Sequence, residues 1–134
     1  MVRKTMKKQD RASLYCVLAG LALFGLGGIG LVFTDLLRMK FDLTHDLFHL
    51  VTGAVLIYGL LSEKEWLAIL LPLGVGTIYL LLGIGGFLSP TLWGIGEAMG
   101  LHLELVENVL HVIMGGWGLY AGLAPSYVPR WSQA

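Results

Sequence analysis

Two short stretches of this chain carry the same arrangement of acids and histidines. The first set is Asp42, His45, Asp46 and His49, and the second, 62 positions later, is Glu104, Glu107, Asn108 and His111. Imidazole and carboxylate groups are ligands for transition metals, and two histidines four positions apart on a helix can chelate one ion. The duplicated spacing therefore predicts a binding site built from two helices.

Helix geometry places each set on one face. Because each residue advances 100° around a helix, the four polar side chains form a stripe roughly 100° wide and about 10 Å long. If the two stripes face each other, they supply the ligands of a zinc, iron, copper or manganese ion. The candidate metal ligands are His45, Asp46, His49, Glu104, Glu107 and His111.

Two other interpretations of these residues remain open. A haem or chlorin-type cofactor could be bound by His49 and His111, which lie at similar depth on different helices with glycines beside them. Alternatively, histidine, acid and amide side chains hydrogen-bond across helices and fix their packing without a cofactor. For His102, whose counterpart in the first stretch is Lys40, the packing role is favoured.

The elements that position these stripes are strongly apolar. Of 134 residues, 56% are hydrophobic and only 13% are charged, and the mean hydropathy is +0.76, which is too apolar for a soluble domain. Four segments reach the roughly 20 residues needed to cross a bilayer. They are 14–33, 44–61, 67–88 and 101–123, of which the second is the shortest and the most polar. The sequence therefore predicts an all-α integral membrane four-helix bundle.

The similarity between the halves extends beyond the polar stripes. The first apolar segment (LFGLGGIGLVF) resembles the third (YLLLGIGGFL), so the chain is interpreted as two tandem helical hairpins, 14–61 and 67–123. A basic arm, 1–13, precedes them and a tail, 124–134, follows. The connection 89–100 holds Pro90 and three glycines and is expected to be irregular or partly re-entrant. Both stripes begin at the start of an even-numbered span, so they must lie on the same side of the membrane.

Charge sets the expected orientation. The arm, the turn at 62–66 and the tail hold more Lys and Arg than the other connections, which predicts cytoplasmic termini and a polar cluster in the outer leaflet. The expected partners are the lipid bilayer and other membrane subunits or a second copy of the chain. The net charge is zero, so a nucleic acid is not expected, and no serine or cysteine lies near a histidine. A role other than catalysis is therefore favoured.

The motifs THDLFHLVTG and ENVLHVIMGGWGL resemble a domain-of-unknown-function family of small four-span membrane proteins from cyanobacteria and actinobacteria. Its second-span pattern, HNxxHLxxGxxGL, is matched by His45, His49, Leu50 and Gly53, with Asp46 in place of asparagine. Its fourth-span pattern is matched by Asn108 and His111, and the resemblance covers about residues 14–123. It implies a four-helix fold in a bacterial plasma or thylakoid-type membrane, without an established activity.

The leading hypothesis is a membrane-embedded module that binds a metal ion or a haem-like cofactor through His49 and His111, supported by His45, Asp46 and Glu107. The alternative is an accessory or assembly subunit of a larger respiratory or photosynthetic complex. In that case the cluster serves as polar packing between helices.

Overall fold

The computed structural model describes residues 8–33, 35–36, 39–40, 42–62 and 64–123. In this part of the chain there are five helices: α1 (Lys8–Gly30), α2 (Leu43–Leu61), α3 (Glu65–Leu88), α4 (Ile95–Ala98) and α5 (Leu105–Leu123). The all-α expectation is confirmed, with one antiparallel pair of two-residue strands, β1 (Asp35–Leu36) and β2 (Met39–Lys40), between α1 and α2. The predicted tail and the first seven residues of the predicted arm lie outside the described residues.

The structure differs from the expected layout in two places. Helix α1 begins at Lys8, before the predicted start of the first span, so residues 8–13 of the arm are helical. The short helix α4 lies inside the connection predicted to be irregular, and it follows Leu92, Trp93 and Gly94, all with positive φ. That left-handed backbone, costly for Leu and Trp, turns the chain sharply between α3 and α4.

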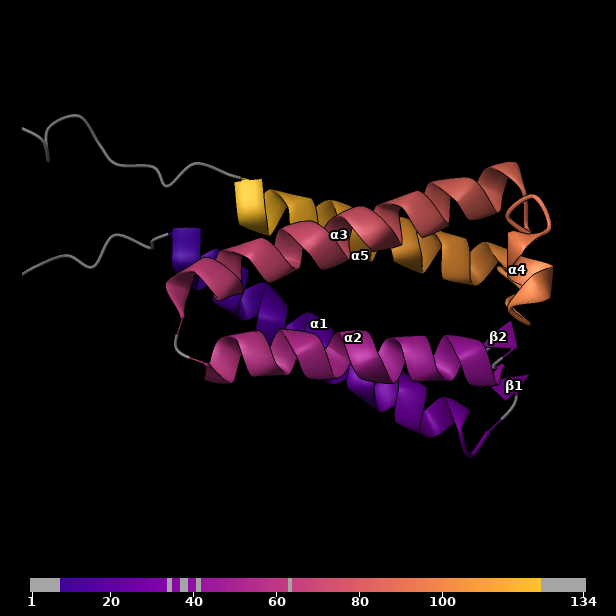
Figure 1. Cartoon of the computed structure of the whole chain (residues 1–134), viewed down its shortest axis with the longest axis horizontal. Helices are drawn as coiled ribbons and strands as arrows, with labels where there is room; N and C mark the ends of the chain where they lie inside the picture. The colour runs from indigo at the N-terminus through magenta and orange to yellow at the C-terminus, as the bar shows by residue number, and fades with distance from the viewer. Residues whose placement is uncertain (1–7, 34, 37–38, 41, 63, 124–134) are drawn as a thin grey trace, which may run out of the picture.

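The long helices pack in two pairs. Helix α1 packs most extensively against α2, and α3 against α5, with fewer contacts between the pairs (Figure 1). The start of α1, the end of α5 and the connection from α2 to α3 lie at one end of the molecule, and β1, β2 and α4 lie at the other. The buried core between the pairs consists of Tyr15, Cys16, Ala19, Leu23, Leu56, Val75, Tyr79 and Ala121.

Three helices in the described part of the chain are long and apolar enough to cross a membrane, over Arg11–Gly30, Leu43–Leu61 and Glu65–Leu88. Helix α5 is not among them, although α2 was expected to be the weakest candidate. The reason is its composition, since Glu107, Asn108 and His111 share its 19 residues with four glycines. Many large apolar side chains on the outside of the long helices are exposed, as a lipid-facing surface requires.

Close backbone contact within each pair depends on glycine. A Cβ added at Gly115 of α5 would collide with the backbone of Leu80 on α3, and a Cβ at Gly53 of α2 would collide with that of Phe24 on α1. Backbone atoms cannot move aside as a flexible side chain can, so any larger residue must push the two helices apart. At the adjacent Gly116, by contrast, a Cβ would meet nothing within 4 Å.

These two neighbouring glycines allow a direct test of the helix pairing. Gly115→Ala is expected to destabilise the protein by about 1–3 kcal/mol, the usual cost of overpacking. Gly116→Ala is expected to be neutral or to stabilise by about 0.5–1 kcal/mol, because alanine is the better helix former. Unfolding in mixed detergent micelles, followed by circular dichroism, measures both. Equal stabilities for the two variants would contradict the close contact between α3 and α5.

Candidate metal centre

The two polar stripes begin at helix starts that are fixed by their own side chains. At α2 the carboxylate of Asp42 accepts a hydrogen bond from the backbone N–H of His45 at 2.8 Å. At α5 the carboxylate of Glu107 accepts one from the backbone N–H of Glu104 at 2.9 Å. These caps satisfy N–H groups that a helix start leaves free. Both starts lie at the end of the molecule that carries α4 (Figure 1), so the stripes are brought to the same level.

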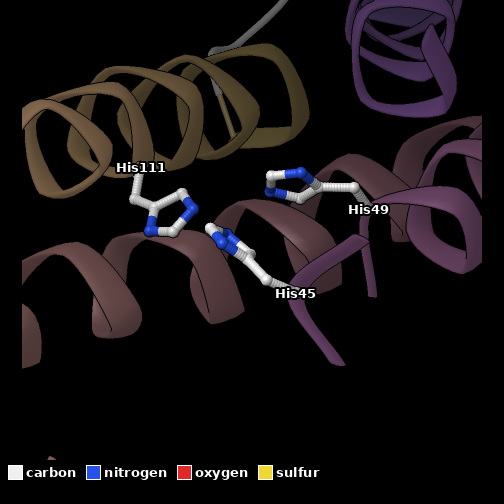
Figure 2. Close-up of side chains that lie close together, drawn as sticks. All are labelled: His45, His49 and His111. Atoms are coloured by element: carbon white, nitrogen blue, oxygen red, sulfur yellow. The ribbon is translucent and has the colours of Figure 1, made fainter. Parts of the chain in front are cut away.

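Three histidines converge at this level. His45 and His49 of α2 and His111 of α5 are only 2%, 6% and 4% exposed. Each offers a ring nitrogen within 4.8 Å of the other two. The ring centroids are 4.3 Å apart for His45 and His49, 5.5 Å for His45 and His111, and 6.0 Å for His49 and His111. Figure 2 shows the three rings turned toward one another, and we call them the histidine triad.

Glu107 lies beside the triad. Its Oε1 atom is 3.5 Å from Nδ1 of His45, and the side chain is 3% exposed. Its other oxygen, Oε2, accepts the capping hydrogen bond at Glu104, so the carboxylate is held between the helix start and the imidazole. A carboxylate next to a histidine is the partner that commonly orients a metal-binding imidazole.

The remaining predicted ligands lie at the edge of this centre. Asp46 is 2% exposed but is not part of the triad, and Glu104 is half-buried and lines a second cavity with Asp42 and His102. Asn108, the counterpart of Asp46, packs its amide against Gly86 of α3, where a Cβ would overlap it. The structure thus gathers four of the six predicted ligands around one point.

Many polar atoms of this region lack partners. Within the described part of the chain, eight buried side-chain atoms make no hydrogen bond. Six belong to the triad and Glu107: both ring nitrogens of His45, both of His49, Nδ1 of His111 and Oε1 of Glu107. A buried polar group without a partner costs about 1–3 kcal/mol, so native proteins seldom tolerate several together. This cluster therefore has the character of a binding site.

Sequence reasoning missed one side chain that borders the triad. Tyr79 of α3 is fully buried, with its ring centroid 5.2 Å from that of His111 and 6.1 Å from that of His49. Its hydroxyl is 2.9 Å from that of Thr52, which in turn donates to the carbonyl of Phe48 on α2. Tyr79 has no polar counterpart in α1, so the repeat gave no signal for it. Its central position in an apolar helix was the only clue available.

The three histidines also line an almost wholly apolar cavity of about 280 Å³. The cavity lies between α1 and α5, and the titratable side chains among the described residues of its wall are His45, His49, His111, Glu107 and Tyr79. The rest of the wall is Ala22, Leu23, Leu26, Leu110, Ile113, Met114 and Trp117. A ligand in this cavity would contact the imidazoles and, over most of its surface, hydrocarbon.

The chemistry available to the triad is that of three imidazoles with an open position. A tetrahedral zinc ion, with Zn–N bonds of about 2.0–2.1 Å, places its ligand atoms about 3.4 Å apart, so small side-chain rotations would close the triad around an ion. Three protein ligands and one open position are typical of zinc sites that bind a further molecule. Comparison with protein-family models, curated proteins and solved structures found no match to this chain.

Proposed function

We propose that this protein is a membrane protein that binds one divalent transition-metal ion through His45, His49 and His111, with Glu107 orienting His45. The observation that carries the proposal is the convergence of buried ring nitrogens that have no hydrogen-bond partner in the described residues. Imidazole suits zinc, copper, iron and nickel, and a site of three histidines is best known for zinc. Zinc is therefore the first ion to test.

Polar packing alone accounts poorly for the cluster. An accessory subunit that used these side chains only to hold helices together would be expected to pair them with one another. Instead, only Nδ1 of His45 approaches another of these side chains, Glu107 at 3.5 Å, and no ring nitrogen of His45 or His49 makes a hydrogen bond within the described residues. A metal ion would satisfy three of these nitrogens at once, so the burial cost supports metal binding over packing.

A haem-like cofactor is also less well supported. A macrocycle held from both faces by His49 and His111 would need the space between those two rings. A ring nitrogen of His45 lies within 4.8 Å of ligand atoms on both, and this third imidazole leaves too little room for a large planar ring. A single ion uses all three histidines and needs no such space.

The proposal includes four spans made of two tandem hairpins, with α5 as the fourth span. Equivalent glycines support the duplication. A Cβ at Gly27 of α1 would collide with the carbonyl of Asp46, and a Cβ at Gly83 of α3 would collide with that of Asn108. Gly83 lies 56 positions after Gly27, and Asn108 lies 62 positions after Asp46, the same offset that relates the two polar stripes. Duplication would also explain why His45 meets Glu107 and His49 meets His111, because they hold matching places in the two halves.

We place the protein in a bacterial plasma or thylakoid-type membrane, with both termini in the cytoplasm and the triad in the outer half. The excess of Lys and Arg in the N-terminal segment supports this orientation. The proposed partners are the lipid bilayer and, within it, other membrane subunits or a second copy of the chain. Burying histidines and acids at this depth is costly, and such residues in spans are usually functional.

Metal analysis of the purified protein tests the proposal. The chain should be purified in detergent with a tag that contains no histidine, incubated with zinc, copper, iron or manganese, and freed of loose ions by gel filtration. We expect close to one ion per chain with zinc and no absorption band of a haem. A helical, monodisperse preparation that retains none of these ions would contradict the proposal.

A further inference from the structure

We propose that the cavity beside the triad binds a neutral, membrane-soluble aromatic molecule of the phenol or hydroquinone class, whose oxygen points to the metal ion. This inference rests on the proposed metal site and adds the class of ligand that occupies its open position. The shape and chemistry of the cavity between α1 and α5 support the inference. The metal proposal does not depend on this cavity.

The cavity is large enough for a substituted ring. Its volume is about 280 Å³, while an engineered apolar cavity of about 150 Å³ holds benzene. Apolar side chains make up most of the wall, and the polar side chains in its described part belong to the triad, Glu107 and Tyr79. This composition fits a molecule with few polar groups and an apolar body. A fully polar molecule would lose its hydration over most of its surface.

The cavity reaches the outer surface of the helices. Among its lining residues, Ala22 of α1 and Leu110 and Ile113 of α5 are also exposed, the last two by 44% and 61%. Helices α1 and α5 pack against each other much less extensively than either packs against its own partner. In a bilayer the exposed faces of these helices contact lipid. A ligand would therefore enter from the membrane, between α1 and α5.

The two halves of the molecule differ at this position. By the offset of 56 positions that relates Gly27 of α1 to Gly83 of α3, Leu23 corresponds to Tyr79, and both line the cavity. On the α2–α3 side, the Tyr79 ring packs against that of Phe48 at 5.7 Å and fills the space. On the α1–α5 side, the smaller Leu23 and Leu110 leave the space open. The smaller residues at these two matching positions thus account for the open space between α1 and α5.

Aromatic character selects the ligand class. The carboxylate of a fatty acid would also coordinate the ion, whose two positive charges more than offset the charge of Glu107, so charge does not distinguish the two classes. A phenol oxygen coordinates a metal ion as well, and its ring is the feature that a fatty acid lacks. The wall also offers the faces and edges of Trp117, Tyr79 and the imidazoles, against which an aromatic ring packs favourably.

Binding of radiolabelled 4-octylphenol to zinc-loaded protein in phosphatidylcholine nanodiscs tests the inference, with empty nanodiscs measuring partition into lipid. We expect saturable binding of one molecule per chain, at least about tenfold tighter than that of octylbenzene or octanoate. Ala22→Phe, which adds a ring at the cavity mouth, should weaken binding by about tenfold or more, as overpacking does. Ala54→Phe makes the same change on an exposed part of α2 away from the cavity and should have no effect.

Zinc content, measured on the same samples, separates the two proposals. If Ala22→Phe keeps its zinc and loses octylphenol binding, the inference is supported. If the protein keeps zinc but binds octylphenol no better than octylbenzene, or binds octanoate as tightly, the inference is overturned and the metal proposal stands. If the parent protein retains no zinc, the metal proposal itself fails. Leu23→Phe, which fills the cavity from inside, should reproduce the loss caused by Ala22→Phe.

Discussion

Replacing His49 or His111 with alanine is expected to lower the affinity for zinc by more than about 100-fold. Each histidine supplies one of only three nitrogens that converge at the triad, and both are almost fully buried. Loss of an outer-shell partner alone typically costs 10–100-fold, so the loss of a direct ligand should cost more. Competition between the protein in detergent and a fluorescent zinc chelator measures the change.

His102→Ala is the matched control for that experiment. His102 lies at the same end of the molecule but is exposed and is not part of the triad, so its loss should change zinc affinity less than about twofold. Circular dichroism and gel filtration show whether the variants stay folded. If the His49, His111 and His102 variants all bind zinc as the parent does, the triad is not the binding site.

Glu107→Gln is expected to weaken zinc binding by about 10–100-fold while leaving the helices intact. The carboxylate lies 3.5 Å from Nδ1 of His45, where it can hold the imidazole in position and increase its strength as a ligand. Glutamine has nearly the same shape, and its oxygen can still cap the backbone N–H of Glu104. A loss of zinc affinity in this variant would therefore result from the loss of negative charge beside His45 and not from a disrupted helix start.

The control for this variant is Glu97→Gln, the same change in an exposed acid of α4. It should bind zinc with the affinity of the parent protein. The same chelator competition applies, together with a thermal melt in detergent for all three proteins. Unchanged zinc affinity in Glu107→Gln, with the parent affinity being tight, would show that Glu107 does not support a metal ligand.

The convergence of the triad could be predicted from the sequence because it follows from helix periodicity and duplication. Equal spacing on two helices that start at the same end brings His49 and His111 to one level, and their rings lie 6.0 Å apart. His45 takes a larger part than the sequence indicated, since its ring lies closer to each of the other two histidine rings than those two lie to each other. Spacing gives the face of a helix but not the side-chain rotamer, which decides how close each nitrogen comes.

The positions at the edge of the stripe could not be predicted. Asp46 and Asn108 lie at about 60° from their histidines, by helix geometry, so a small change in helix rotation decides which neighbour they meet. In the structure, the amide of Asn108 packs against Gly86 of α3. The rotation of each helix depends on the close contact of Gly53 with α1 and of Gly115 with α3. A comparison of the α2 and α5 sequences gives no information about these contacts.

Neither the cavity nor α4 could be predicted from the sequence. The cavity arises because Leu23 takes the place that Tyr79 fills in the other half, and that correspondence becomes visible only when the helices are paired. Helix α4 has four residues, which is too short for a periodic pattern, and it depends on positive φ at Leu92 and Trp93, where a glycine would be expected.

X-ray absorption at the zinc edge tests the central claim most directly, because it reports the atoms bound to the ion in the folded protein. For the zinc-loaded parent in detergent, we predict three imidazole nitrogens at about 2.0–2.1 Å and one oxygen ligand in the fourth position. The outer-shell scattering of imidazole rings should fall by about a third in His45→Ala. A first shell of oxygens without imidazole scattering, or a spectrum unchanged by loss of His45, would contradict a metal centre built on the triad.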